Sequence, residues 1–312
     1  MLRLSHHEIE GNPGRLPTWQ SATLRIMPNQ TRSINGHSVP RFMYGTAWKE
    51  DETQRLVALA IQQGFRAIDT ANQRRHYHEA GVGLAVAEAI AKGLVVRDDL
   101  FLQTKFTFQA SQDHRLPYDP KASITEQVPL SFASSLEHLG VETIDSYLLH
   151  GPSQRLGLSS MDWEAWRAME TIHDGGRVRF LGVSNVTREQ LDRLCQSARV
   201  RPTFVQNRCY AERGWDREVR ELCMANQIAY QGFSLLTANR STLADPEMKR
   251  IAKRHQRTMN QIVFRFALDV QMMLLTGTTD AKHMQEDLDV FGFHLEPEEI
   301  QQIDLLHRHR PA

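Results

Sequence analysis

The chain has 312 residues, and its 37 basic and 37 acidic side chains leave no formal net charge at neutral pH. A balanced charge gives no reason to expect a nucleic acid as a partner, and no apolar run approaches the roughly 18 residues that span a membrane. The three cysteines form no close pair, which favours a reducing compartment over a disulfide framework. Composition is therefore typical of a cytoplasmic enzyme.

The first part of the chain is expected to stand apart from the rest. Residues 1–33 lack the apolar core of a secretory signal, so we expect an N-terminal extension, with an amphipathic, arginine-bearing transit peptide as the alternative. Residues 34–312 are expected to form one domain, because α/β barrels reach about 250 residues without dividing.

Strand and helix patterns alternate from about residue 42 to the end. The strand candidates are short and rich in Ile, Leu, Val and Phe, as strands buried on both faces are. They span residues 41–45, 67–69, 100–105, 144–150, 178–184, 204–207, 228–233 and 273–276. The helical patterns span residues 53–63, 79–91, 128–139, 163–173, 187–197, 216–225, 246–255 and 283–290.

Helix ends are marked by capping signals. Thr187 and Gln190 resemble a capping box, and Gly64, Gly140 and Gly175 stand where helices should stop. Eight strands and eight helices in alternation predict a single (β/α)₈ TIM barrel. An open doubly wound sheet is the alternative, but no Gly-x-Gly-x-x-Gly follows the first strand. Two further helices, at 259–269 and 297–306, are expected to pack outside the barrel.

Polar residues end three successive strand candidates. Asp69, Lys105 and His150 each close one of them, and Tyr77 follows Asp69 in the next loop. The carboxyl ends of barrel strands meet on one face, where active sites are built. The sequence therefore predicts that these four side chains form one site.

These residue types suit the reduction of a carbonyl group. Such a reaction needs a hydride donor and a proton for the developing alkoxide. A phenol titrates near 10, so Tyr77 would need a nearby cation to relay a proton at neutral pH. Lys105 would supply that charge while Asp69 holds its ammonium, and a neutral His150 would orient or polarise the carbonyl oxygen.

The segments around these residues resemble the aldo-keto reductases. They read GFRAIDTANQRRHYHEAGVG at 64–83, LQTK at 102–105, IDSYLLHGP at 144–152, GVSN at 182–185, YQGFSLL at 230–236 and GFHLEPEEIQQID at 292–304. Residues 34–46 look like the family's N-terminal hairpin and first strand, and the resemblance covers roughly 34–306. It implies an NAD(P)H-dependent reductase of an aldehyde or ketone. It also implies that Tyr77 is the general acid, tuned by Lys105 and Asp69, with His150 positioning the substrate.

The chain departs from the family pattern at the tyrosine. Counting from Asp69 lands on Arg74, and counting back from the following helix lands on His76. Tyr77 is the only tyrosine in this stretch, so we interpret the difference as an insertion of about two residues. The neighbouring His-x-His-Glu at 76–79 has no third ligand at a recognisable spacing, and no metal is expected.

Cofactor contacts are expected at the later strands. Ser184 and Asn185 end the fifth strand and Gln206 the sixth, where hydroxyl and amide groups suit a nicotinamide carboxamide. Phe233 stands where the family stacks an aromatic ring on the nicotinamide. The alternatives are a core role for Phe233 and a strand cap for Gln206. The loop with Ser234 and Leu236, and the stretch with Thr278 and Thr279, would enclose the ribose and pyrophosphate.

The residues after the eighth strand bear on the choice between NADP(H) and NAD(H). Many members carry Lys-Ser and then Arg after the eighth strand to hold the 2′-phosphate. Aligned through Glu286, this chain has Gly277-Thr278 and His283, with Asp287 in place of an Asn. NADP(H) is favoured by the resemblance, and NAD(H) is the alternative.

Trp48 and Tyr118 are the expected substrate-binding residues. Trp48 follows the first strand, and Tyr118 belongs to the long loop at 106–121. The expected partner is a small carbonyl compound, with no nucleic acid or membrane, and a monomer is favoured. The alternative function is a cofactor-binding regulatory or interaction protein, resembling the potassium-channel β subunits, with little turnover.

Overall fold

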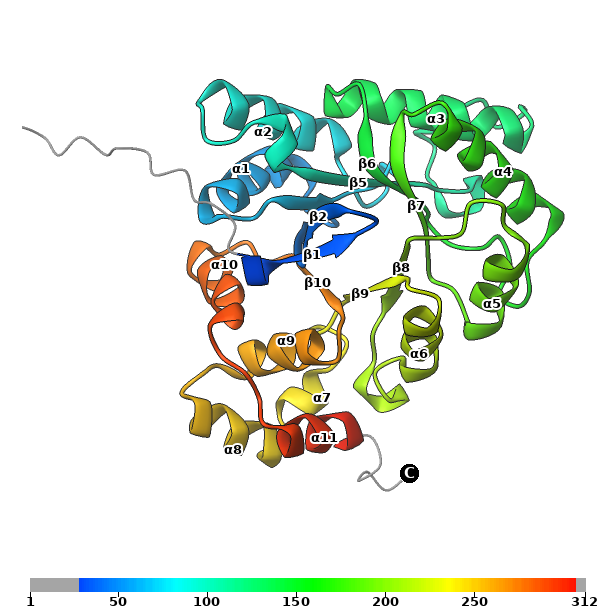
Figure 1. The fold of residues 1–312 in the computed structure, drawn as a ribbon. Helices are drawn as coiled ribbons and strands as arrows, with labels where there is room; N and C mark the ends of the chain where they lie inside the picture. The colour runs from blue at the N-terminus through cyan, green and yellow to red at the C-terminus, as the bar shows by residue number, and fades with distance from the viewer. Residues whose placement is uncertain (1–27, 307–312) are drawn as a thin grey trace, which may run out of the picture.

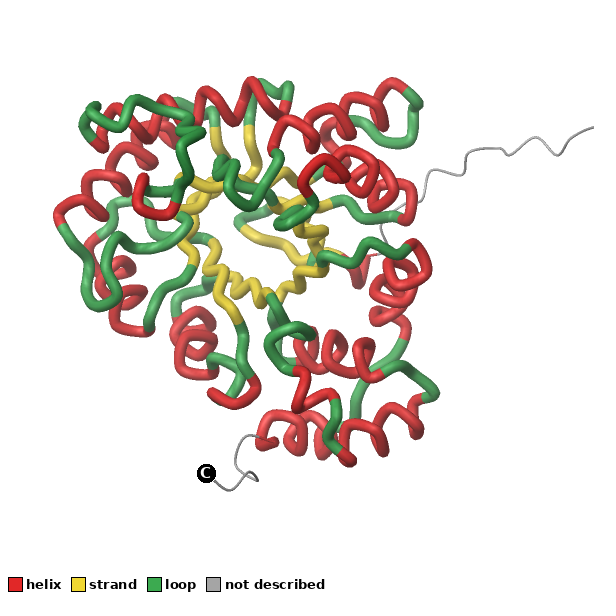
Figure 2. The backbone as a smooth tube through the Cα atoms, turned by 180° about the vertical axis from the view of Figure 1, so that it is seen from behind, coloured by secondary structure: helices red, strands yellow, loops and turns green. Residues whose placement is uncertain are grey.

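A closed barrel of eight parallel strands dominates the computed structural model, which describes residues 28–306 (Figures 1 and 2). Around the barrel the strands follow the order β10-β3-β4-β5-β6-β7-β8-β9. They are β3 (Phe42–Gly45), β4 (Ala67–Asp69), β5 (Phe101–Phe106), β6 (Ile144–Leu149), β7 (Val178–Ser184), β8 (Phe204–Arg208), β9 (Ala229–Phe233) and β10 (Met273–Thr276). The predicted single (β/α)₈ barrel is confirmed.

Helices form the outer layer around the strands (Figure 2). They are α1 (Thr53–Gln63), α2 (Glu79–Ala91), α3 (Ile124–Leu139), α4 (Ser160–Asp174), α5 (Arg188–Ser197), α6 (Arg217–Ala225), α7 (Arg240–Leu243), α8 (Pro246–His255), α9 (Met259–Asp269), α10 (Ala281–Leu288) and α11 (Pro297–Leu305). Within residues 28–306, no helix is long and apolar enough to cross a membrane.

An antiparallel hairpin covers the end of the barrel where the strands begin (Figure 1). It consists of β1 (Thr31–Ile34) and β2 (His37–Pro40). Its Asn35-Gly36 turn has φ of 48° and 81°, the double positive φ that favours Asn-Gly in two-residue hairpins. The hairpin thus starts inside the predicted extension of residues 1–33, of which residues 1–27 lie outside the described chain.

The barrel interior is apolar near the hairpin and polar at the other end. Phe101, Phe180 and Phe204 pack ring against ring, with centroids 5.6–6.4 Å apart. A Cβ at Gly182 would lie 2.4 Å from a Leu148 methyl carbon, so the filled interior requires glycine there. On the side of this layer away from the hairpin, the interior of the barrel has room for polar side chains.

One helix differs from its expected place. Residues 259–269 form α9, which packs on β10 and α10 and buries every residue from Gln261 to Leu268. Burial of that extent makes α9 the barrel helix before β10, while α8, expected there, buries fewer residues and lies outside α9. The expected outer position of 259–269 was wrong because two amphipathic helices follow β9 and the pattern does not rank them.

Capping residues explain where other helices begin and end. The helices α3 and α4 start earlier than expected, because Glu126 accepts from the Ser123 amide and Asp162 exchanges hydrogen bonds with Ser159. The Thr187 cap of α5 forms as predicted, with Gln190 N donating to Thr187 Oγ1 over 3.2 Å. Gly64 and Gly140 take the expected left-handed C-cap conformation, whereas after α4 Gly176, not Gly175, has positive φ.

Candidate active site

A cavity of about 620 Å³ opens at the strand ends, on the face away from the hairpin. The backbone of this face is turned towards the viewer in Figure 2. The cavity gathers most of the predicted site residues, which come from eight different segments of the chain. The predicted residues in its wall are Trp48, Asp69, Tyr77, His150, Ser184, Asn185, Gln206, Phe233, Ser234, Leu236, Thr278, His283 and Asp287. Lys105 is bonded to Asp69 directly beneath them.

Asp69 and Lys105 form a buried ion pair. The Lys105 ammonium donates to Asp69 Oδ1 at 2.7 Å, to Asp69 Oδ2 at 2.8 Å and to the Thr70 carbonyl oxygen at 2.8 Å. An ammonium has three N–H donors, so this arrangement uses all of them. Burial lowers the pKa of Lys105, and the Asp69 carboxylate opposes that shift. The pair is thus held rigidly at the junction of β4 and β5.

Three glutamine side chains surround the carboxylate of Asp69. Gln103 and Gln206 donate to Asp69 Oδ1 at 2.7 and 2.9 Å. Gln231 accepts from both of these amides, at 2.8 and 3.0 Å, and donates back to Gln103 at 3.0 Å. The network links β4, β5, β8 and β9 across the barrel, so it fixes the position of the carboxylate.

Tyr77 lies between Lys105 and His150 at the base of the cavity. The Lys105 ammonium is 5.3 Å from the centroid of the Tyr77 ring, and the His150 ring is edge-on at 5.9 Å. Within residues 28–306 the Tyr77 hydroxyl has no hydrogen-bond partner, and the ring lines the open cavity. Burial, followed by the Asp69 carboxylate, raises the pKa of the phenol above its usual value. The phenol therefore stays protonated at neutral pH, in contrast to the lowered pKa expected from Lys105.

His150 is held neutral beside Tyr77. Burial lowers its pKa to about 3, with smaller effects from Lys105 and His76. Nδ1 lies 2.7 Å from Oγ1 of Thr107, a contact that fixes the ring. When the hydroxyl donates to Nδ1, the proton of the imidazole is on Nε2, where it can point into the cavity.

The ends of β7 and β8 present a polar wall. Ser184 Oγ donates to the Gln206 carbonyl oxygen at 2.7 Å and accepts from Asn185 Nδ2 at 3.1 Å. Asn185, at a positive φ of 56°, also donates to the His150 carbonyl oxygen at 2.8 Å. Within residues 28–306, the side-chain carbonyl oxygens of Asn185 and Gln206 have no partner, so both remain available to an N–H donor in the cavity.

The other walls come from β9, β10 and the loop after β3. Phe233 ends β9, and Ser234 follows with a positive φ of 56°. Trp48, which is 69% exposed, packs against His76 with ring centroids 4.0 Å apart and ring planes tilted by 40°. Lys49 donates to the Gly277 carbonyl oxygen and thereby joins the loop to the end of β10.

An acidic residue lies in the wall beside α10. Burial raises the pKa of Asp287 to about 7, against the opposing effects of a hydrogen bond from Thr276 and the charge of His283. The carboxyl therefore changes its charge within the physiological pH range. This change in charge would directly alter the electrostatic interaction with an anion bound nearby.

Besides Lys105, which lies beneath the cavity, three predicted residues are absent from the described cavity wall. Tyr118 is buried, and its hydroxyl donates to the Thr107 carbonyl oxygen at 2.7 Å, so it supports Thr107 from outside the cavity. Thr279 is exposed outside the wall. Glu286 faces outward on α10 and pairs with Lys282 at 3.7 Å. The loop at 106–121 instead borders a side cavity of about 340 Å³ that Tyr77 also lines.

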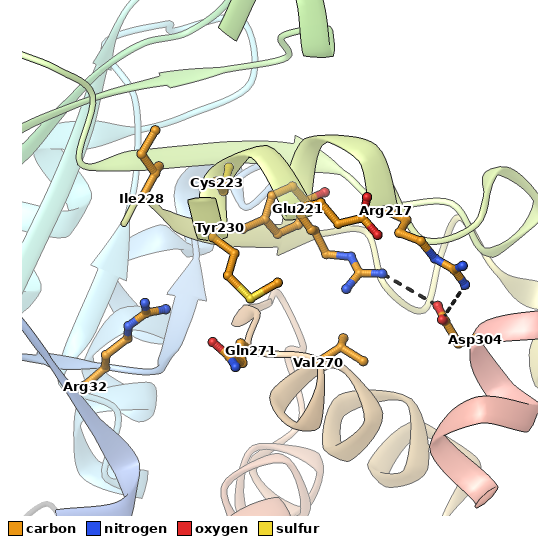
Figure 3. A pocket seen from close by; sticks show the side chains of 11 residues that line it. Arg32, Arg217, Glu221, Cys223, Ile228, Tyr230, Val270, Gln271 and Asp304 are labelled. Atoms are coloured by element: carbon orange, nitrogen blue, oxygen red, sulfur yellow. Dashed lines mark hydrogen bonds and ion pairs between the residues drawn. The ribbon is translucent and has the colours of Figure 1, made fainter. Parts of the chain in front are cut away.

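A separate cavity of about 250 Å³ lies between the hairpin, α6, α9 and α11 (Figure 3). Its charged residues are largely paired: Asp304 of α11 contacts Arg217 and Arg220 of α6. None of the Tyr77, Lys105 and His150 side chains lines it. These ion pairs attach α11 to the barrel, and we assign the chemistry to the strand-end cavity.

The model of the aldo/keto reductase family matches residues 41–308 of the chain. The chain belongs to the aldo/keto reductase family. An uncharacterized oxidoreductase of Bacillus subtilis is 30% identical over 274 residues, covering 87% of this chain and 90% of that protein. The glyoxal reductase of the same organism is 28% identical, covering 88% and 91%. The predicted family and the prediction of an enzyme are confirmed.

Solved structures show the same likeness. An aldo/keto reductase from Brucella melitensis superposes with a TM-score of 0.76 at 28% identity, covering 90% of this chain and 98% of that one. A Bombyx mori aldo-keto reductase in complex with NADP gives a TM-score of 0.73 at 26% identity, covering 90% and 93%. Each of the two structures thus matches 90% of this aldo-keto reductase chain.

Sequence reasoning missed several residues of this site. Gln103 and Gln231 each lie two residues before a named strand-end residue, so the period of two along a strand was a usable signal. Thr107 follows the end of β5 directly. Lys49 gave no signal, because its partner Gly277 lies 228 positions later.

Proposed function

We propose that this aldo-keto reductase reduces an aldehyde or ketone to an alcohol, with hydride from NADP(H) and the proton from Tyr77. One observation carries the proposal: Tyr77, the Lys105–Asp69 ion pair and a neutral His150 meet at the base of one open cavity. A protonated phenol beside a ring N–H donor suits an oxygen atom that gains negative charge.

The cavity fits a nicotinamide dinucleotide. The free carbonyl oxygens of Asn185 and Gln206 would accept from the carboxamide N–H groups, and Phe233 would pack on the ring. The loop with Ser234 and Leu236, together with Thr278 and His283, would enclose the ribose and phosphate groups. When bound, the reduced nicotinamide supplies hydride to the carbonyl carbon. The NADP complex of the Bombyx mori relative supports NADP(H) as the cofactor.

Individual side chains would bind the carbonyl group and transfer the proton. His150 Nε2–H would hold the carbonyl oxygen, and Tyr77 would donate its proton to the developing alkoxide. Lys105, 5.3 Å from the Tyr77 ring centroid, would stabilise the tyrosinate that remains. Trp48 and His76 would hold the substrate's side chain, because their packed rings border the open cavity. Substrates with an apolar group beside the carbonyl suit this border best.

The competing function is a regulatory cofactor-binding protein with little turnover. The observation that favours it is the saturated Lys105 ammonium, whose three donors all go to Asp69 and Thr70 rather than to the Tyr77 hydroxyl. A reductase and a regulator predict the same dinucleotide binding. They differ in whether a carbonyl compound is consumed.

Mixing the purified chain with NADPH or NADH and a panel of aldehydes and ketones separates the two functions. Loss of the dihydronicotinamide absorbance that depends on both protein and carbonyl supports the reductase. Tight dinucleotide binding without oxidation by any member of the panel supports the regulator.

The remaining predictions concern the molecule as a whole. We propose a cytoplasmic location, supported by Cys195, Cys209 and Cys223, which are buried free thiols. We also propose that residues 34–312 act as one domain and as a monomer. Gel filtration with light scattering would test the last point, and a mass of two or more chains would contradict it.

A further inference from the structure

We propose that Lys49 binds the 2′-phosphate of NADP(H) in this chain and sets the preference for NADP(H) over NAD(H). The inference rests on the proposed function for the identity of the cofactor. Lys49 belongs to the loop after β3. It faces the segment between β10 and α10 but is not part of that segment.

The position of Lys49 is fixed by its neighbours. The Trp48 amide donates to the His76 carbonyl oxygen at 2.7 Å, and the Lys49 carbonyl oxygen accepts from the Glu52 amide at 2.9 Å. The Lys49 ammonium reaches across the cavity wall and donates to the Gly277 carbonyl oxygen. The backbone therefore presents this side chain at the end of β10.

The ammonium occupies space that glycine leaves free. A Cβ at position 277 would lie 3.5 Å from Lys49 Nζ and 4.0 Å from Lys49 Cε. A long side chain at 277 would compete with Lys49 for this part of the wall. The pair of Gly277 and Lys49 thus places a cation from one loop where β10 itself carries none.

Within residues 28–306, the charge of Lys49 has no anionic partner. In the described chain, no carboxylate lies within ion-pair distance of the ammonium, and the side chain is partly buried. Burial lowers its pKa, and no charged group offsets that shift. One of its three N–H donors goes to Gly277, so two remain for a ligand. A partly buried cation with free donors gains most from a bound dianion.

The surrounding groups complete a phosphate site. Thr278 lies beside Gly277 in the wall. Tyr44 Oη donates a hydrogen bond to the Thr278 carbonyl oxygen at 3.0 Å. His283 lies in the first turn of α10, whose amide end is electropositive. Asp287, on α10, is the acidic group of the same wall that lies one turn from His283. Its carboxylate would repel a phosphate, so Lys49 is the cation that offsets it.

The strand order indicates which phosphate this is. The carboxamide acceptors Asn185 and Gln206 end β7 and β8, whereas Gly277 follows β10, with β9 between β8 and β10. A dinucleotide with its nicotinamide at β7 and β8 would extend towards β10 with its adenosine end. The phosphate on that end is the 2′-phosphate, which NAD(H) lacks.

The test is the affinity of Lys49→Met for four probes: NADPH, NADH, 2′,5′-ADP and 5′-ADP, titrated by calorimetry. We expect a loss of roughly 10- to 100-fold for NADPH and 2′,5′-ADP, the scale of a charged hydrogen bond. NADH and 5′-ADP should change less than about two-fold. Lys49→Arg should keep most of the affinity, and circular dichroism should show an intact barrel for both variants.

Lys282→Met is the matched control, since it removes a lysine of α10 whose side chain is 81% exposed outside the cavity. It should leave all four affinities unchanged. Equal losses for NADPH and NADH with Lys49→Met would overturn the inference, as would an unchanged NADPH affinity. The ADP probes involve no hydride transfer. A selective loss of 2′,5′-ADP binding in a chain that reduces no carbonyl would therefore support Lys49 while removing the reductase proposal.

Discussion

The Thr107 hydroxyl lies 2.7 Å from Nδ1 of His150, and the neighbouring Thr107 carbonyl oxygen accepts from Tyr118 Oη at 2.7 Å. The buried tyrosine thus fixes the threonine, and the threonine fixes the imidazole. Burial keeps the pKa of His150 at about 3, so its ring is neutral and has one proton to place. A hydroxyl that donates to Nδ1 leaves that proton on Nε2.

Thr107→Val should therefore lower kcat for carbonyl reduction by about 10-fold, the scale of one hydrogen bond in the transition state. The affinity for NADPH should not change, because Thr107 lies outside the cavity wall. Thr107→Ser, which keeps the hydroxyl, should retain most of the activity. A valine variant with parental kcat would show that the contact does not orient His150.

The position of Asp287 predicts a pH dependence of cofactor binding. Its pKa is raised to about 7, whereas a free aspartate titrates near 3.9. The carboxyl is thus neutral below pH 7 and charged above it, and the charged form repels a phosphate. We expect NADPH affinity to weaken from about pH 6 to pH 8, and Asp287→Asn to bind NADPH more tightly above pH 7 and to lose part of this dependence.

The comparison between Asp287→Asn and the parental chain cancels the titration of the phosphate itself, which occurs near pH 6 in both. Titrations of NADPH at three pH values, by fluorescence quenching, measure the difference. Identical pH profiles for the two proteins would show that Asp287 does not face the phosphate groups.

The burial of the Lys105–Asp69 ion pair leads us to predict an effect on stability that the sequence did not indicate. The side chain is fully buried and bonded to Asp69, so Lys105→Met leaves a carboxylate buried without its cation. Breaking such a pair costs about 3–5 kcal/mol. Asp69→Asn together with Lys105→Met should recover much of that loss, while both variants lack reductase activity. Urea unfolding followed by circular dichroism gives the two free energies, and equal stabilities would contradict the pairing.

Much of the fold follows from local patterns, and the site follows from them in part. The strand ends at Asp69, Lys105 and His150 are recognisable because a barrel brings all strand ends to one face. The burial of Lys105 is not recognisable from the sequence, because a lysine that ends a strand is exposed in most settings. Its partner Asp69 is held by Gln103 and Gln206, which come from different strands.

Other features depend on contacts between distant segments. The contact of Lys49 with Gly277 joins positions that no local pattern relates. Two amphipathic helices follow β9, and which of them packs on the barrel depends on the complete burial of α9. The expected lowering of the Tyr77 pKa by Lys105 needed a free ammonium donor, whereas Asp69 and Thr70 accept from all three.

The measurement that tests the central claim most directly is the rate of carbonyl reduction by Tyr77→Phe at saturating NADPH. The phenylalanine keeps the ring between Lys105 and His150, so the cavity and the cofactor affinity should persist. We predict a loss of about 10²–10⁴-fold in kcat, the scale of a general acid, with an NADPH Kd within about two-fold of the parental value. Near-parental turnover by this variant would contradict the account.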